Sequence, residues 1–465
     1  MSAIVFDHLY FRYGEGSPTL LRDLSLELDY GKFVLITGHS GSGKSTIMNL
    51  INGAIPNYVK GQIVGDILID GESNKGKSIG EISLKVGSVL QNADLQIIHD
   101  LVDDEIAFGL ENLAFPKEKI AQSVDKYASA LSLDPGYETK KLSGGQKQRL
   151  ISSSTLAMSR KIIILDEPLA NLDFRGAKII LDELKRLTQE EGYLVILIEH
   201  RLDNLGPYVD ECYVLGNESL NKKGFDEIER EFSKEIEYEP NDGIKDGVVL
   251  SCHDVTVSFR KRVILENVSF QIQEGERVLI LGENGVGKTT LSKVLARLIK
   301  PEKGKIESSI PRHGWFKNVG YIFQNPDYQL FMPSLERELS YACKDEVLKE
   351  YAIKYLGLED ILDRHPYSLS EGQKRKVAAL AIILMKPRIL FLDEPTVGQD
   401  DESLIKLISL VNKLNKENGT TIISITHDKR CAKALCDKAI WLKGESVYKT
   451  GDNSLVDEYF SKEGI

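Results

Sequence analysis

The chain contains one glycine-rich motif twice, and this repetition constrains its fold more than any other feature. The first copy consists of Gly38, His39, Ser40, Gly41, Ser42, Gly43, Lys44, Ser45 and Thr46, and the second of Gly282, Glu283, Asn284, Gly285, Val286, Gly287, Lys288, Thr289 and Thr290. Each copy matches the pattern G-x-x-x-x-G-K-[ST], follows a short apolar run and opens a helical pattern, which is the context of a phosphate-binding P-loop. Glycine lets the backbone wrap around a phosphate so that amide groups point inward. Lys44 and Lys288 are then expected to reach the β- and γ-phosphates, and the hydroxyls of Ser45 and Thr289 to hold Mg²⁺.

Three further motifs recur with the same spacing in both halves of the chain. The first set consists of Ser143, Gly144, Gly145 and Gln146, then Asp166 and Glu167, then His200; the second consists of Ser370, Glu371, Gly372 and Gln373, then Asp393 and Glu394, then His427. From serine to aspartate, and from aspartate to histidine, the number of intervening residues is identical in the two sets. Such spacing indicates two duplicated domains rather than a short-period repeat.

These motifs resemble those of the ATP-binding cassette family, in which an L-S-G-G-Q signature lies between a P-loop and an acidic strand end. The resemblance covers almost the whole chain. It implies an α/β fold of two P-loop NTPase cassettes, each with a mainly parallel sheet core and an inserted helical subdomain, and the alternation of β-branched runs with helical patterns supports the parallel sheets. We expect the first cassette at residues 2–216, an acidic linker at 217–247, the second cassette at 248–452 and a polar tail at 453–465. The linker is expected to be solvated, with one short helix near Phe225–Phe232.

The resemblance also implies a catalytic role for each recurring residue. The Mg²⁺ ligands would be Ser45, Gln91 and Asp166 in the first cassette and Thr289, Gln324 and Asp393 in the second. Glu167 and Glu394 are the expected general bases, and a positioned base contributes about 10² to 10⁴-fold to a rate. His200 and His427 match the switch histidines that contact the γ-phosphate and orient the attacking water.

In this family, ATP lies between the P-loop of one cassette and the signature of the other, so both signatures are expected nucleotide contacts. A tandem chain can form that pair within itself. The second half departs from the family at Glu371, where glycine is usual, and at Gln399, where leucine is expected beside Asp400. Glu371 could repel ATP phosphates or point harmlessly to solvent. Tyr13 and Phe259 stand where the family stacks an aromatic ring on adenine, although an aromatic residue at a strand end can instead belong to the core.

Composition limits the alternatives. A net charge of −11 provides no basic excess for neutralising phosphates, so no nucleic-acid partner is expected. The 5 cysteines form no C-x-x-C pair and are expected to be reduced thiols. The longest uninterrupted apolar stretch, Val377–Met385, is far shorter than the roughly 20 residues of a membrane-spanning helix, and no secretory signal is evident. If the chain serves transport, other proteins must form the membrane pore.

Gln91 and Gln324 match the glutamines of the family's Q-loops, and the segments that begin at these residues indicate a transport subtype. Gln91–Ile98 reads Q-N-A-D-L-Q-I-I and Gln324–Phe331 reads Q-N-P-D-Y-Q-L-F, which resemble the Q-N-P-D-x-Q stretch of energy-coupling-factor ATPases. That resemblance implies ATP-driven uptake of a vitamin, cobalt or nickel at the cytoplasmic face of the cell membrane. The expected partners are multi-spanning membrane subunits, namely a transmembrane coupling protein and a substrate-binding component. The apolar residues that suit a groove for a coupling helix, unless they belong to the core, are Leu95, Ile97, Ile98, Leu330 and Phe331.

Two other functions remain open at this point. Tandem cassettes without membrane spans also act in translation or ribosome recycling. Members of that group commonly carry a long, charged, helical linker or iron–sulfur cysteines ahead of the first cassette. Here the segment 217–247 is short and acidic, and no cysteine cluster precedes Gly38. Tandem sugar-import ATPases are a closer alternative, but the Q-N-P-D stretches fit them less well.

Overall fold

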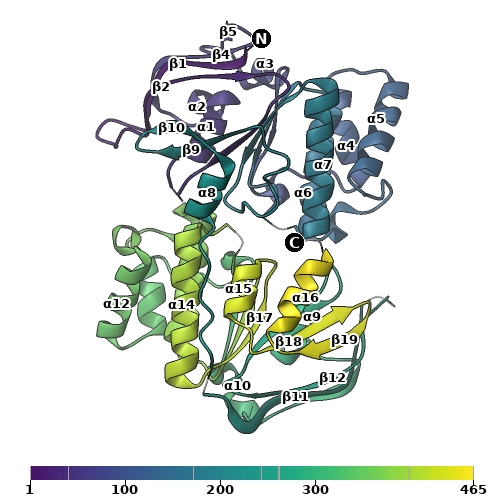
Figure 1. The fold of residues 1–465 in the computed structure, drawn as a ribbon, viewed down its shortest axis with the longest axis vertical. Helices are drawn as coiled ribbons and strands as arrows, with labels where there is room; N and C mark the ends of the chain where they lie inside the picture. The colour runs from purple at the N-terminus through teal and green to yellow at the C-terminus, as the bar shows by residue number, and fades with distance from the viewer. Residues whose placement is uncertain are drawn as a thin grey trace. The chain divides into compact units, whose positions relative to one another are not determined.

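The computed structural model describes residues 2–39, 41–170, 172–241, 243–259, 262–396 and 398–463. The chain divides into two compact units, Met1–Lys234 and Glu235–Ile465 (Figure 1). Each unit contains a mainly parallel six-stranded sheet, a smaller antiparallel sheet and flanking helices, which confirms the predicted fold class. Among the residues that the structure describes, none of the helices combines the length and the apolar character needed to cross a lipid bilayer.

The core of the first unit is a sheet with the strand order β10-β9-β3-β8-β7-β6. Its strands are β3 (Phe33–Thr37), β6 (Val86–Val89), β7 (Ile162–Asp166), β8 (Leu194–Ile198), β9 (Glu211–Gly216) and β10 (Ser219–Lys223). Every pair is parallel except β9 with β10. Strands β3, β7 and β8 are buried along their whole length, as expected for a parallel sheet covered on both faces. The smaller sheet, in the order β2-β1-β4-β5, consists of β1 (Ser2–Arg12), β2 (Leu21–Asp29), β4 (Gln62–Ile69) and β5 (Glu72–Ser73).

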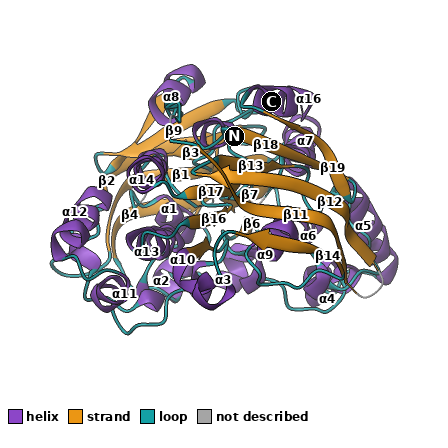
Figure 2. Ribbon diagram, turned by 90° about the horizontal axis from the view of Figure 1, so that it is seen from below, coloured by secondary structure: helices purple, strands orange, loops and turns teal. Residues whose placement is uncertain are grey.

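Helices flank these strands, and Figure 2 draws the helices in purple and the strands in orange. They are α1 (Lys44–Ile51), α2 (Ala54–Asn57), α3 (Ile79–Ser83), α4 (Val102–Asn112), α5 (Lys117–Ala130), α6 (Gly144–Ala157), α7 (Phe174–Glu191) and α8 (Phe225–Phe232). Helices α4, α5 and α6 lie between β6 and β7 in the chain and pack against one another. They form the inserted helical subdomain that the sequence predicted.

The second unit repeats this arrangement with the strand order β15-β16-β17-β13-β18-β19 and a smaller sheet β12-β11-β14. Its strands are β11 (Lys245–Phe259), β12 (Arg262–Glu274), β13 (Arg277–Leu281), β14 (Lys303–Ser308), β15 (Val319–Ile322), β16 (Ile389–Asp393), β17 (Thr421–Ile425), β18 (Lys438–Lys443) and β19 (Ser446–Gly451). Its helices are α9 (Lys288–Leu295), α10 (Trp315–Asn318), α11 (Leu335–Ala342), α12 (Glu346–Leu356), α13 (Glu371–Leu384), α14 (Asp401–Asn418), α15 (Lys429–Ala434) and α16 (Ser454–Glu463). The residues expected as a polar tail instead form α16, because its apolar face is buried against α15 and β18.

The segment expected as a solvated acidic linker is largely built into the two units. It begins with β10, which pairs with β9, and continues with α8, the short helix that the sequence predicted. The glutamates from Glu227 to Glu239 are exposed, as expected, but Ile228 and Phe232 on the other face of α8 are buried in the core of the first unit. An amphipathic helix of this kind is stabilised by burying its apolar stripe rather than by its own propensity.

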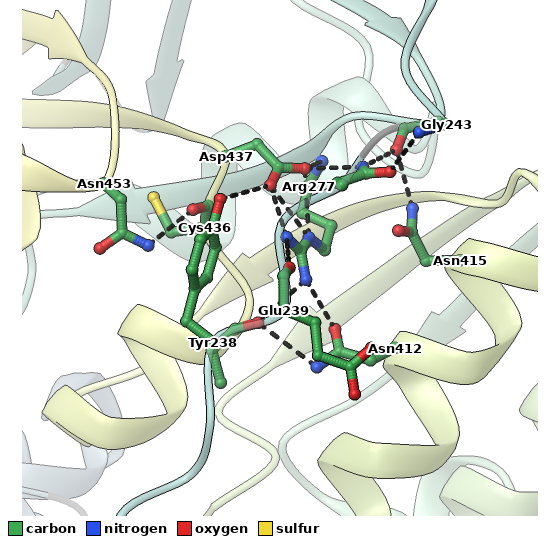
Figure 3. Close-up of polar contacts among 12 residues, drawn as sticks. Tyr238, Glu239, Gly243, Arg277, Asn412, Asn415, Cys436, Asp437 and Asn453 are labelled. Carbon is green, nitrogen blue, oxygen red and sulfur yellow. Dashed lines mark hydrogen bonds and ion pairs between the residues drawn. The ribbon is translucent and has the colours of Figure 1, made fainter.

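From Glu235 onward the chain belongs to the second unit and packs around one buried ion pair (Figure 3). Arg277 Nη2 lies 2.6 Å from Asp437 Oδ1, with side chains only 2% and 8% exposed. The same guanidinium donates to the carbonyl oxygen of Glu239 at 2.7 Å and lies over the ring of Tyr238. Asn241 donates to Asp437 Oδ2 at 2.8 Å. These contacts anchor residues 238–241 on the second unit.

Candidate active site

Each P-loop lies where a buried strand of the main sheet meets a helix, β3 with α1 and β13 with α9. Gly38 and Gly282 adopt φ of 147° and 150°. A Cβ atom at Gly38 would lie 2.5 Å from the carbonyl oxygen of Leu215, so this turn requires glycine. Lys44 Nζ donates to the carbonyl oxygens of Gly38 and His39, both at 2.9 Å. Lys288 repeats this geometry, so each ammonium lies inside its own loop.

The remaining P-loop residues are largely accessible, as a phosphate site requires. The exposed residues are His39, Gly41 and Ser45 in the first loop and Glu283, Asn284 and Gly285 in the second. The half-buried residues are Ser42, Gly43, Val286, Thr289 and Thr290, and the buried ones are Thr46 and Gly287. Ser40 lies outside the described residues. Gly43 and Gly287 have φ of 104° and 102° and immediately precede the helices, so successive backbone N–H groups converge on the loop.

The residues predicted to hold Mg²⁺ supply hydroxyl and carboxylate oxygens, the ligands that Mg²⁺ prefers. Thr289 Oγ1 donates to Asp393 Oδ1 at 3.0 Å, and Ser45 hydrogen-bonds Asp166 in the same way. Burial raises the pKa of Asp166 to about 6, against the effect of its bond to Ser45. Among the described residues no group of three or more His, Cys, Asp or Glu side chains forms a closed metal cage. A hydroxyl beside a carboxylate fits an ion that takes its other ligands from nucleotide and water.

The predicted base and switch histidine meet in both units because their parallel strands are paired at the carboxyl ends. The residue before each glutamate pairs with the last residue of the neighbouring strand, Asp166 with Ile198 and Asp393 with Ile425. His200 Nε2 lies 3.2 Å from Glu167 Oε1, and His427 Nε2 lies 3.3 Å from Glu394 Oε1. Both glutamates adopt positive φ, 48° and 52°.

The surroundings of Glu167 favour its ionised form. Burial opposes ionisation, but the hydrogen bond and charge of His200 and the charge of Lys44 outweigh it and lower the pKa of Glu167. Gln91 Nε2 also donates to Glu167 Oε2 at 2.6 Å. The structure therefore places Gln91 on the carboxylate of Glu167, and its role as a metal ligand stays a prediction, as does that of Gln324. An ionised carboxylate at this position is able to accept a proton from water.

Sequence reasoning missed a second carboxyl group beside the first of these centres. Glu199 is 2% exposed, and its oxygens accept hydrogen bonds from the backbone N–H groups of Leu169, His200 and Arg201. Burial, together with the charge of Glu167, raises the pKa of Glu199 to about 8. The difference between Ile198-Glu199-His200 and the corresponding Ile425-Thr426-His427 was the sequence signal that could have revealed it.

The raised pKa of Glu199 predicts a pH-dependent stability of the first unit. The folded state binds this proton more tightly than the unfolded state, so the contribution is fully present below pH 4.5 and is lost as the pH rises through about 8. Across that window the wild-type unit should lose about 3 to 5 kcal/mol of unfolding free energy relative to Glu199→Gln. Hydrogen exchange of peptides from β7 and β8 measures this, and parallel pH curves for the two proteins would contradict it.

Both signature serines cap the helix that follows them. Ser143 accepts a hydrogen bond from the backbone N–H of Gln146, whose side chain returns a bond to the serine N–H, and Ser370 and Gln373 repeat this capping box. Gly144 is exposed, whereas Gly145 and Gly372 are buried. The exposed serines at these helix N-termini are placed to donate to an anion.

The structure shows which groups surround Glu371 within its own unit. Its carboxylate lies 3.4 Å from Lys374 Nζ, which also lies 2.9 Å from Asp327 in the turn after the Q-loop. An acidic residue in the first turn of a helix is also favoured by the helix dipole. The charge of Glu371 is thus partnered within its own unit. Gln399, the second departure, donates to the carbonyl oxygen of Gly372 at 3.2 Å, so both departures adjoin the same helix start.

The two predicted adenine-stacking residues are not core residues. Tyr13 is 46% exposed and Phe259 is 48% exposed. Tyr13 OH shares a 2.7 Å hydrogen bond with Thr46 Oγ1, which places the ring beside the P-loop helix. The alternative that these rings belong to the core is therefore wrong, and their stacking role stays a prediction. All cysteines are buried free thiols, as expected.

The apolar residues after the Q-loops divide into exposed and buried members. Leu95, Ile98 and Phe331 are 81%, 67% and 78% exposed, whereas Leu330 is 7% exposed and belongs to the core. The expectation that Leu330 faces a partner is wrong, because its side chain packs under the turn. Ile97 is partly buried against the core of its unit.

Two buried glutamates, also missed from the sequence, hold these turns in place. Glu105 Oε2 accepts hydrogen bonds from the N–H groups of Ile98 and His99, both at 2.8 Å. Glu338 Oε2 accepts the corresponding bonds of the second unit, from Phe331 at 2.9 Å and Met332 at 2.8 Å. The exposed apolar side chains are therefore presented on fixed backbone.

Comparison with known proteins agrees with the duplicated architecture. The sequence profile described as ABC transporter matches residues 21–170 and 265–397. A Methanosarcina mazei protein, provisionally named an ABC transporter ATP-binding protein, is 31% identical over 96% of this chain and 88% of its own length. Bacillus subtilis YkoD, provisionally named an HMP/thiamine import ATP-binding protein, is 31% identical over 94% of this chain and 89% of its own length.

A likeness among solved structures concerns the fold alone. A chain from the solved structure described as a model of ribosome-bound archaeal Pelota and ABCE1 has a TM-score of 0.76 at 22% identity, covering 98% of this chain and 81% of that chain. The motifs in both units, the matching profile and the relatives along nearly the whole chain lead to one conclusion. The chain belongs to the ABC transporter family and is a tandem-cassette ATPase that hydrolyses ATP.

Proposed function

We propose that this chain is the ATP-hydrolysing subunit of an energy-coupling-factor type importer, acting at the cytoplasmic face of the membrane on the uptake of a small solute through separate membrane subunits. One observation carries the proposal. Exposed apolar side chains follow both Q-loops, Leu95 and Ile98 in the first unit and Tyr328 and Phe331 in the second, and we call each pair the coupling patch of its unit. Fixed, exposed apolar groups of this kind suit the apolar face of a partner helix.

The chemistry at each site follows from the residues described. The P-loop amides and Lys44 or Lys288 would bind the phosphates, with each lysine exchanging its carbonyl partners for phosphate oxygens. Mg²⁺, when bound, supplies charge neutralisation at the phosphates. Glu167 or Glu394 would accept the proton of the attacking water, and the adjacent histidine would hold that carboxylate and the water in line.

The coupling patch of the first unit adjoins the catalytic residues through the Q-loop. Gln91 contacts Glu167, and only a few residues later Leu95 and Ile98 are exposed. A helix that displaces this turn would move the amide that contacts the base. The name of the Bacillus subtilis relative, which refers to import, also supports the proposal.

Action on ribosomes is the main alternative to the proposed function. The likeness to ABCE1-containing structures rests on fold at low identity. The net charge of −11 offers no general excess of cations for ribosomal RNA. No observation favours a sugar importer over the proposed type.

Charged substitutions in the two coupling patches should separate these functions. We expect Leu95→Glu with Phe331→Glu to weaken binding to inverted membrane vesicles from the source cells at least about tenfold, because buried apolar anchors contribute about 2 kcal/mol or more each. Affinity for ATP should be unchanged. Co-sedimentation with vesicles and, separately, with ribosomes from the same cells measures the two interactions.

The matched control is Val64→Glu with Tyr448→Glu, since both residues are exposed and lie outside both patches, at 65% and 54%. These substitutions should leave vesicle binding unchanged. Vesicles treated with protease should lose binding, because the proposed partner is a membrane protein. Sedimentation with ribosomes but not with vesicles would overturn the proposal.

A further inference from the structure

We propose that Glu199 is a positioning residue of the first cassette, whose buried carboxyl ties the segment after Glu167 to the segment that carries His200. This inference rests on the proposed roles of Glu167 and His200. Glu199 itself touches neither the P-loop lysine nor the predicted metal ligands through any hydrogen bond among the described residues. It acts through the backbone on either side of the reacting groups.

The hydrogen bonds of Glu199 join two segments that are far apart in the sequence. Its Oε1 accepts from the N–H of Leu169 at 2.9 Å, two residues after Glu167. Its Oε2 accepts from the N–H groups of His200 at 3.1 Å and Arg201 at 3.4 Å. The strand ladder ends just before this point, where the N–H of Glu167 donates to the carbonyl oxygen of Ile198 at 2.9 Å. The carboxyl therefore continues the connection beyond the last ladder bond.

The second cassette reaches the same geometry with different side chains. Thr426 and Thr396 stand at the positions of Glu199 and Leu169, and their hydroxyl oxygens lie 3.4 Å apart. Thr426 Oγ1 accepts from the N–H of Asp428 at 3.1 Å. The distance from histidine to glutamate is nonetheless 3.3 Å, against 3.2 Å in the first cassette. In the first cassette the carboxyl of Glu199 thus connects the segment after the glutamate to the segment with the histidine, and in the second cassette two threonine hydroxyls do so.

Replacing Glu199 alone with the threonine of the second cassette should not reproduce the contacts of that cassette. A threonine at position 199 is too short to reach the N–H of Leu169. The side chain of Leu169 has no hydroxyl with which that threonine could form the contact seen between Thr396 and Thr426. A buried N–H left without a partner is costly, so the segment should shift until it finds one. Threonine at both positions would restore the arrangement of the second cassette. The structure therefore predicts that positions 169 and 199 are energetically coupled.

Charged groups lie close to Glu199 and affect its ionisation. Glu167 and His200 lie on the neighbouring strand ends, and Arg201 is paired with Asp203 at 3.3 Å. A second buried carboxyl beside the proposed base is electrostatically unfavourable unless its hydrogen bonds compensate. The three backbone donors offset part of that cost, but burial and the charge of Glu167 still raise the pKa of Glu199.

The test measures the kinetics of the full chain carrying Glu394→Gln, so that hydrolysis reports the first cassette. Glu199→Thr should lower kcat about tenfold or more with KM for ATP changed less than about twofold, because small displacements of positioned groups act mainly on the chemical step. Leu169→Thr with Glu199→Thr should recover kcat to within about threefold of the parent. If Glu394→Gln alone removes all turnover, the centres are coupled, and the same series in the wild-type chain shows the full effect.

A matched control removes another buried carboxyl of the first unit, Glu183→Gln on α7, where the partner is Arg186 at 2.7 Å. It should leave kcat unchanged. Thermal unfolding of each variant identifies losses that are merely structural. Unchanged kcat in Glu199→Thr, or a folded double variant as slow as the single one, would overturn the inference. Undiminished hydrolysis in Glu167→Gln would instead refute the proposed base, whatever the Glu199 variants show.

Discussion

Replacing Glu167 and Glu394 together with glutamine is expected to abolish measurable ATP hydrolysis while ATP binding persists. Glutamine keeps the shape of each side chain but cannot accept a proton from water, and loss of a positioned base costs about 10² to 10⁴-fold in rate. The P-loop groups that would bind the phosphates, including Lys44 and Lys288, are untouched by the substitution. Phosphate release and equilibrium binding of a fluorescent ATP analogue measure the two effects separately.

The control for this experiment is Glu190→Gln with Glu417→Gln. These residues occupy corresponding places near the ends of α7 and α14, and their side chains are 66% and 62% exposed. Their replacement should change neither hydrolysis nor binding, because exposed ion pairs contribute little. Undiminished turnover in the variant lacking both proposed bases would refute their assignment, and loss of nucleotide binding would show that the substitution had damaged the site.

The second large effect is expected at the buried ion pair of the second unit. Arg277→Ala should lower the unfolding free energy of that unit by about 3 to 5 kcal/mol, since it leaves Asp437 buried without its cation. It should also release residues 238–241, because Arg277 binds the carbonyl oxygen of Glu239 and contacts the ring of Tyr238. The chain contains 2 tryptophans, Trp315 and Trp441, and both lie in the second unit. Tryptophan emission during urea unfolding therefore reports this unit selectively.

The first unit provides the comparison for that substitution. Phe33 stands where the second unit has Arg277, and Asp210 takes its charge partner from Lys185 of α7 at 2.8 Å. This pair is 16% and 32% exposed, so Lys185→Ala should cost only about 1 kcal/mol. Hydrogen exchange at the residues after Glu235 measures release of the anchored segment. A change below about 1 kcal/mol in Arg277→Ala would show that water or nearby groups compensate Asp437.

Features that depend on local geometry and on spacing could be predicted from the amino-acid sequence. The P-loops require glycine at Gly38 and Gly282, because the carbonyl oxygens of Leu215 and Leu442 leave no room for a Cβ. The two serine, aspartate and histidine sets recur at equal spacing, which predicted two duplicated domains, and their resemblance to the ATP-binding cassette family implied α/β units with inserted helices. The helix at Phe225–Phe232 was also predictable, since its apolar residues lie on one face.

Properties that depend on neighbours distant in the chain follow only from the packing of the folded protein. Leu330 and Phe331 are adjacent apolar residues, yet only packing makes the first core and the second exposed. The charge of Glu371 is partnered by Lys374, which the fold also brings against Asp327 in the turn after Gln324. Glu199 becomes a bridge only because parallel pairing of β7 and β8 brings Leu169 beside it. The acidic segment is anchored because Arg277 and Asp437 are brought together in the second unit, where burial makes the loss of either partner costly.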